Sequence, residues 1–188
     1  MLWAWLNVVV MDRIYLDYAA STPVHPRVLR AMEPYFSEKF GNPGSLHSFG
    51  QEAIAAVDKS RETIARAIRS SFREVVFTGS ATEANNLVLR GAIKVFSFKL
   101  LAFSKTKKEN LTANSYKLKP RIIISAIEHE SVLETVRDLE KDGVEVIYIP
   151  VSREGIVDIV KLKSALNERT VLVSIMYANN EIGTIQPI

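Results

Sequence analysis

Three short apolar stretches follow one another along the chain: IIIS at 122–125, VEVIYI at 144–149 and VLVSIM at 171–176. Two segments with helical character, 131–141 and 158–168, separate them. Near-continuous apolar strands that alternate with helices are typical of a parallel sheet with helices on both faces. Gly143 suits the end of the first helix, and Asp158 suits the start of the second. The sequence therefore predicts an α/β fold built on a mainly parallel sheet.

The segments before this region predict further elements. Helices are expected at 26–40, 51–70 and 81–94, and the apolar run at 75–78 is expected to be a buried strand. The first of these helices would carry one apolar face, formed by Val28, Leu29, Met32 and Phe36.

Polar loops follow three of the expected strands. TGSAT at 78–82 follows the first, IEHE at 127–130 follows the second, and YANNE at 177–181 follows the last. Right-handed crossovers place the loops after parallel strands at one edge of a sheet, which is where open α/β sheets bind ligands. We therefore expect a ligand site at this edge.

The first of these loops has the composition of an anion site. Gly79 permits a tight turn, Ser80 and Thr82 offer hydroxyl groups, and the amides at the start of the helix from Ala81 favour a phosphate. The loop is not a P-loop, and the chain has no Gly-x-Gly-x-x-Gly motif. The alternative is an ordinary strand-to-helix turn capped by hydroxyl groups.

The other two loops carry a titratable ring and a pair of amides. His129 lies between Glu128 and Glu130, where it would stack on a flat heterocycle or transfer a proton, or simply begin a helix. Asn179 and Asn180 suit a phenolic oxygen or a carboxylate, and such a pair is also common in turns. Both interpretations of each loop stay open at this point.

Five motifs follow one another along the chain: YLDYAASTPV at 15–24, FGNPGSLHSFG at 40–50, FTGSATEANNL at 77–87, EH at 128–129 and VSIMYANNEIGTIQPI at 173–188. In this order they resemble the cysteine desulfurases of the iron–sulfur and nitrogenase-maturation branch, within the class V aminotransferase group. The resemblance implies the incomplete large domain of a type I fold (aspartate aminotransferase-like) that depends on pyridoxal 5′-phosphate.

The resemblance also implies residue roles. Ala81 and Thr82 match the positions that hold the cofactor phosphate, and His129 matches the histidine that stacks on the pyridine ring and takes part in proton transfer. Asn180 matches the asparagine near the phenolic oxygen of the cofactor and the carboxylate of the substrate. Family members act on L-cysteine as homodimers, form L-alanine, and pass the sulfur as a persulfide to a scaffold protein.

The chain departs from the family in what it lacks. It contains no cysteine, and the family's Schiff-base lysine and nucleophilic cysteine match positions beyond Ile188. The chain taken alone is therefore expected to be inactive. One alternative is a non-catalytic half-domain that binds a full-length desulfurase or another partner, and another is a different class V lyase or aminotransferase.

Charge and composition limit the remaining possibilities. The net charge of +3 arises from a basic insertion at about 97–120, which holds six lysines and one glutamate, so no nucleic-acid partner is expected. The three histidines are too dispersed for a metal site. Residues 1–11 form an expected N-terminal extension that is too short to span a membrane, and residues 12–188 form the expected half-domain. A cytoplasmic protein is predicted.

Overall fold

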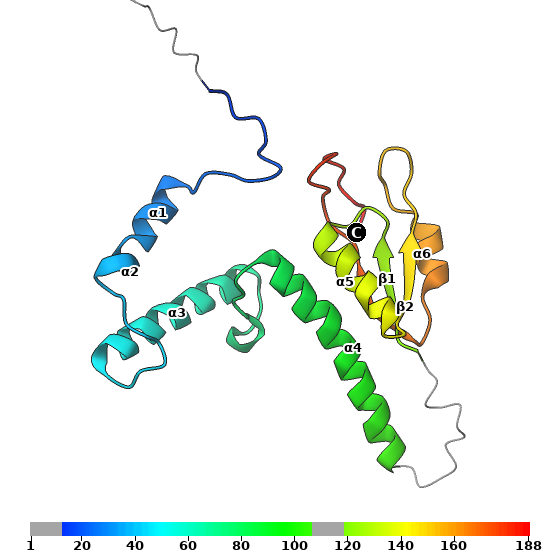
Figure 1. The fold of residues 1–188 in the computed structure, drawn as a ribbon, viewed down its shortest axis with the longest axis horizontal. Helices are drawn as coiled ribbons and strands as arrows, with labels where there is room; N and C mark the ends of the chain where they lie inside the picture. The colour runs from blue at the N-terminus through cyan, green and yellow to red at the C-terminus, as the bar shows by residue number, and fades with distance from the viewer. Residues whose placement is uncertain (1–12, 107–118) are drawn as a thin grey trace, which may run out of the picture. The chain divides into compact units, whose positions relative to one another are not determined.

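The structure is a computed structural model that describes residues 13–106 and 119–188 (Figure 1). The expected N-terminal extension at 1–11 and most of the basic insertion lie outside these residues. The chain divides into two compact units between Val75 and Val76, and each unit is described by itself below.

The C-terminal unit contains the predicted parallel sheet. Its strands are β1 (Arg121–Ser125), β2 (Glu145–Ile149) and β3 (Thr170–Ser174). The strand order is β2-β1-β3, and both pairings are parallel. All three strands overlap the predicted ones, so the interpretation of the apolar stretches is confirmed.

Helices cover both faces of this sheet, as predicted. They are α4 (Ala81–Thr106), α5 (Glu130–Lys141) and α6 (Ile159–Ala165). Ile122 and Ile124 of β1 are fully buried in a core cluster with α4 and α5, which includes Leu89 and Val136. The intervening Ile123 is also fully buried, in a second cluster that includes residues of α6. The alternation of side chains along β1 thus gives the sheet two apolar faces.

The boundaries of these helices follow local sequence signals. The side chain of Asp158 accepts a hydrogen bond from the backbone N–H of Lys161 at 3.0 Å, so Asp158 is the predicted N-cap of α6. Gly143, the second residue after α5, has a φ of +88°, as the left-handed position at a helix end requires. α4 is longer than predicted, because it continues into the start of the basic insertion.

The N-terminal unit contains short helices and one long helix. They are α1 (Pro26–Met32), α2 (Pro34–Ser37), α3 (Ser48–Ala67) and the 3₁₀ helix η1 (Phe72–Glu74). The prediction of one helix over 26–40 is wrong, because Pro34 lacks the N–H that would continue the first helix. Its expected apolar face is at least 44% exposed at every position: Val28, Leu29, Met32 and Phe36.

The prediction of a buried strand at 75–78 is also wrong. These residues are not part of a strand, and Val76 and Phe77 are 65% and 47% exposed. A strand forms only where a neighbouring strand accepts its backbone hydrogen bonds. Within the described residues, the sheet contains only β1, β2 and β3, and none of them pairs with this run.

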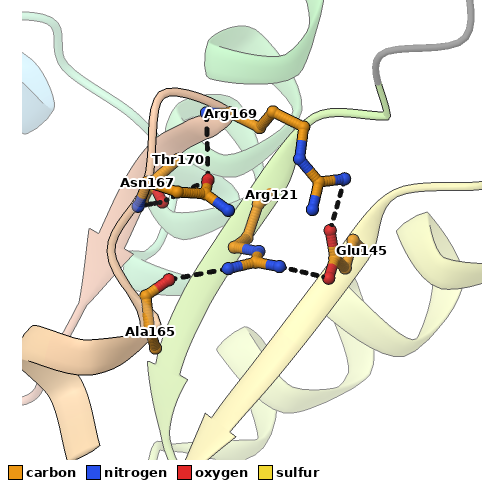
Figure 2. A network of polar contacts seen from close by, with 6 residues as sticks. All are labelled: Arg121, Glu145, Ala165, Asn167, Arg169 and Thr170. Atoms are coloured by element: carbon orange, nitrogen blue, oxygen red, sulfur yellow. Dashed lines mark hydrogen bonds and ion pairs between the residues drawn. The ribbon is translucent and has the colours of Figure 1, made fainter.

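A polar network joins the first residues of the strands (Figure 2). The guanidinium of Arg121 donates to Glu145 Oε1 at 2.5 Å and to the carbonyl oxygen of Ala165 at 2.7 Å. Arg169 Nη1 lies 2.8 Å from Glu145 Oε2. The network ties β1, β2 and the segment before β3 together at the end of the sheet opposite to the polar loops.

This network predicts a pH dependence of stability. The hydrogen bond from Arg121 holds the pKa of Glu145 below its ordinary value of 4.5, although burial opposes the shift. Since the pKa is lowered in the folded state, the stabilisation is present above pH 4.5 and is lost as the pH falls through the folded pKa. Urea unfolding should show that Glu145→Gln is less stable than the wild type at pH 7. We expect this difference to shrink below pH 4.5, and a difference that stays constant would contradict the assignment.

No helix within the described residues is both long enough and apolar enough to cross a membrane.

Candidate functional site

The loops that follow β1 and β3 meet at the carboxyl edge of the sheet. Together they line a cavity of about 340 Å³. Its lining contains the predicted site residues His129 and Asn180, and its other members are Ile127, Glu128, Glu130, Asn179, Glu181 and Ile182. Of the three loops that were expected at one edge, the IEHE and YANNE loops thus lie together, whereas no residue of the TGSAT loop lines this cavity.

A buried carboxylate joins these two loops. Glu128 is 7% exposed, and its Oε1 accepts hydrogen bonds from Ser125 Oγ at 2.6 Å and from the backbone N–H of Met176 at 2.6 Å. Its Oε2 lies 3.4 Å from Ser174 Oγ, which donates to it. Ser125 ends β1, while Ser174 and Met176 belong to the end of β3 and the loop after it. Glu128 therefore fixes the separation of the two loops that line the cavity.

The two neighbouring asparagines have different environments. Asn179 Oδ1 accepts hydrogen bonds from the backbone N–H groups of Glu181 and Ile182 at 2.9 and 3.0 Å, and its Nδ2 donates to the carbonyl oxygen of Ile127 at 3.2 Å. Asn179 thus stabilises a turn, which is one of the two roles that the sequence left open for this pair. Asn180 is exposed, and its side chain makes no hydrogen bond within the described residues. Its amide is free to bind a ligand in the cavity.

A buried glutamine joins the segment after the YANNE loop to the backbone of residues 155–157. Gln186 is 2% exposed, its Oε1 accepts from the backbone N–H of Val157 at 2.8 Å, and its Nε2 donates to the carbonyl oxygen of Gly155 at 2.7 Å. Gln186 and Glu128 were part of the sequence motifs, but neither of them was assigned a role. A polar side chain that must be buried gives no signal until the fold supplies its partners.

His129 is the N-cap of α5. Its Nδ1 accepts a hydrogen bond from the backbone N–H of Ser131 at 3.1 Å and lies 2.8 Å from Ser131 Oγ. His129 is exposed and lines the cavity, and its ring hydrogen bonds within the described residues use Nδ1 and not Nε2. The role at the start of a helix, which the sequence left open, is therefore present. It uses Nδ1 of the ring.

The predicted anion loop begins α4. Glu83 accepts the backbone N–H of Gly79 at 2.6 Å, and Ser80 Oγ accepts the backbone N–H of Glu83 at 3.1 Å, so a capping arrangement orders this turn. The backbone N–H groups of Ala81 and Thr82 have no partner within the described residues, as expected for the first turn of a helix.

Ala81 and Thr82 are not part of the lining of the cavity. Their helix nevertheless contacts the His129 loop one turn further on, where Asn85 Nδ2 donates to Ser131 Oγ at 2.8 Å. α4 and α5 also share the core cluster on the same face of the sheet. The structure brings His129 and Asn180 together, and it connects the start of α4 to them through Asn85 and Ser131.

The family comparison agrees with the five sequence motifs. The model of the aminotransferase class-V family matches residues 14–99 and 104–188. Cysteine desulfurase IscS of Dictyoglomus turgidum is 46% identical over 175 residues, which cover 93% of this chain and 40% of that protein. Cysteine desulfurase IscS of Rickettsia massiliae is 43% identical over 176 residues, which cover 93% of this chain and 38% of that protein.

Solved structures give the same result for the fold. A NifS-like protein superposes with a TM-score of 0.79 at 40% identity, over 93% of this chain and 43% of that one. SspA, solved in complex with cysteine, superposes with a TM-score of 0.74 at 36% identity, over 92% of this chain and 44% of that one. The chain thus has part of the type I fold of pyridoxal-phosphate enzymes, as predicted, and spans about 40% of the length of the curated relatives that it matches. It belongs to the class V aminotransferase family, among homologues of the cysteine desulfurases, and corresponds to their N-terminal half.

Proposed function

We propose that this chain is the N-terminal portion of a pyridoxal-phosphate-dependent cysteine desulfurase. The complete enzyme would convert L-cysteine and an acceptor to L-alanine and a persulfide. The observation that carries the proposal is the cavity shared by His129 and Asn180, in a chain 46% identical to a cysteine desulfurase. Under this proposal, residues 12–188 form half of a domain that is completed by the remainder of the enzyme.

The residues present fit the cofactor. The free amides of Ala81 and Thr82 and the Thr82 hydroxyl offer donors for a phosphate at the positive end of α4. The exposed ring of His129 offers a face for stacking on a heterocycle, and the free amide of Asn180 offers a donor for a phenolic or carboxylate oxygen. Pyridoxal phosphate supplies an electron sink for bond changes in the bound amino acid.

The chain provides binding and orientation, and not the sulfur chemistry itself. It contains no cysteine, so the thiolate that would attack the sulfur of the substrate must come from other residues of the enzyme. We therefore propose that the chain alone is inactive. We further propose that the complete enzyme is a homodimer that passes sulfur to a scaffold protein.

Exposed apolar surface supports a second candidate, a half-domain without activity that binds a protein partner. In the C-terminal unit, Val160 and Val76 are 78% and 65% exposed, and in the N-terminal unit Leu46 and Leu16 are 93% and 86% exposed. Apolar side chains this exposed favour a covering partner. Such a partner would be a full-length desulfurase or another protein.

Co-expression tests the leading proposal. This chain would be produced together with the C-terminal part of the Dictyoglomus relative that it does not cover. The purified pair should show a pyridoxal phosphate absorbance band and form alanine from L-cysteine, whereas the chain alone should form none. In the pair, His129→Ala should weaken cofactor binding on the order of tenfold, because ring stacking and one hydrogen bond are lost.

A matched histidine serves as the control for this test. His25 caps α1 in the N-terminal unit and is not part of the lining of the cavity, so His25→Ala should leave cofactor binding unchanged. A pair that binds the cofactor but releases no alanine from L-cysteine would reject the desulfurase assignment. A chain that binds an intact desulfurase, but never forms an active pair, would support the second candidate.

A further inference from the structure

The backbone N–H and the hydroxyl group of Ser131 both lie within hydrogen-bond distance of the same nitrogen of His129. The backbone N–H of Ser131 lies 3.1 Å from His129 Nδ1, and the Ser131 hydroxyl lies 2.8 Å from it. A backbone amide can only donate, so Nδ1 must offer its lone pair to this contact. In the neutral ring, the proton is then on Nε2.

The hydroxyl of Ser131 is held in place from α4. Ser131 is 8% exposed, and Asn85 Nδ2 donates to its Oγ at 2.8 Å. Because Asn85 occupies a lone pair of this oxygen, the hydroxyl proton is directed away from Asn85 and is available to Nδ1. Asn85 and Ser131 are 46 residues apart in the chain, and their contact forms only where α4 packs beside α5.

The other two histidines lack this second donor. Nδ1 of His25 accepts the backbone N–H of Arg27 at 3.2 Å, and Nδ1 of His47 accepts the backbone N–H of Gly50 at 3.4 Å. Each has one backbone donor, and no side-chain hydroxyl bonds to its ring within the described residues. His129 is thus the most strongly constrained of the three rings.

We propose that the Asn85–Ser131 pair is a positioning device that fixes His129 as its Nε2–H tautomer and thereby presents a hydrogen-bond donor to the cavity. The inference rests on the proposed function only for the identity of the ligand. The inference predicts that the ligand atom facing Nε2 accepts a hydrogen bond, as a carboxylate or phenolate oxygen does.

Nitrogen NMR of the cofactor-free chain tests the tautomer directly. The chain would be labelled with ¹⁵N-histidine, and the three rings would be assigned from His25→Gln and His47→Gln variants. We expect His129 to show a protonated Nε2 and an unprotonated Nδ1. Ser131→Ala removes one of the two donors and should raise the Nδ1–H population about tenfold, whereas Ser131→Thr keeps a hydroxyl group and should restore the wild-type spectrum.

The outcomes separate this inference from the proposed function. A wild-type ring protonated at Nδ1, or an unchanged population in Ser131→Ala, would overturn it. Circular dichroism of each variant shows whether α5 remains folded, and the unaltered His25 and His47 signals provide an internal reference in the same sample. The measurement needs no pyridoxal phosphate, so failure of the chain or the reconstituted pair to bind the cofactor would count against the proposed function alone.

Discussion

Replacing Glu128 with alanine is expected to lower the free energy of unfolding of the C-terminal unit by about 3 kcal/mol. The side chain is 7% exposed and accepts three hydrogen bonds, from Ser125, Ser174 and the backbone N–H of Met176. Alanine would leave these donors unpaired in the interior, and each buried unpaired donor costs on the order of 1–3 kcal/mol. The expected total is below their sum because water can enter the space that the carboxylate vacates.

Two further variants separate the role of Glu128 from a general effect of charge. Glu128→Gln retains one acceptor oxygen and should lose less stability than Glu128→Ala. Glu130 is the matched control, since its side chain is 71% exposed and it lies two residues away, at the first position of α5. Glu130→Ala should change stability by less than about 0.5 kcal/mol. Urea unfolding monitored by far-ultraviolet circular dichroism measures the stability of all three variants. Equal losses of stability for Glu128→Ala and Glu130→Ala would contradict the role of Glu128 as a buried carboxylate that joins the two loops.

The same substitution should also separate the two cavity loops. Hydrogen exchange is expected to accelerate at residues 126–130 and 176–182, which Glu128 joins, before it accelerates in the centre of β1. This order follows because Ile122, Ile123 and Ile124 are fully buried and do not depend on the carboxylate. The cavity that contains His129 and Asn180 is therefore the part of the unit most sensitive to Glu128.

The parallel sheet was predictable because its strands carry their own signal. Each is a short, nearly continuous apolar run, and a strand that is covered on both faces needs apolar residues at successive positions. The order β2-β1-β3 then placed the loops after β1 and β3 side by side, which brought His129 and Asn180 to one cavity. The rule for open α/β sheets was enough to select that edge.

The two incorrect elements failed for different physical reasons. Over 26–40 the apolar periodicity outweighed Pro34 in the interpretation, although a proline inside a helix removes a hydrogen bond and ends the first helix at Met32. At 75–78 the apolar composition was that of a strand, but composition does not supply a neighbouring strand. Strand pairing depends on the whole fold, and none of the described strands pairs with residues 75–78.

The hydrogen bonds that organise the site could not be predicted from the sequence, for a related reason. Met176 donates to Glu128 across 48 residues, and Asn85 donates to Ser131 across 46. No local pattern links such positions. The sequence identified the residues that face the cavity by their place after strands, but not the residues that hold them.

Gly50→Ala is expected to disrupt the loop at 41–50 with a cost of about 3 kcal/mol. Gly50 is buried in the first turn of α3, and a Cβ placed on it would lie 2.2 Å from the carbonyl oxygen of Ser45 and 2.8 Å from that of Asn42. Both neighbours are backbone atoms, which cannot rotate away as a side chain would. The loop must therefore move off the helix, and this requirement explains why the FGNPGSLHSFG motif ends in glycine.

Gly44 provides a control within the same loop. A Cβ on Gly44 would meet only the Asn42 side chain, at 3.4 Å, so Gly44→Ala should cost less than about 0.5 kcal/mol. Hydrogen exchange over residues 41–51 distinguishes the two variants, because 3 kcal/mol corresponds to an acceleration of about 100-fold. The amide of Gln51, which donates to the carbonyl oxygen of His47 at 3.0 Å, should show this change in Gly50→Ala alone. Equal protection in both variants would mean that the loop and α3 are not held together by backbone contact at Gly50.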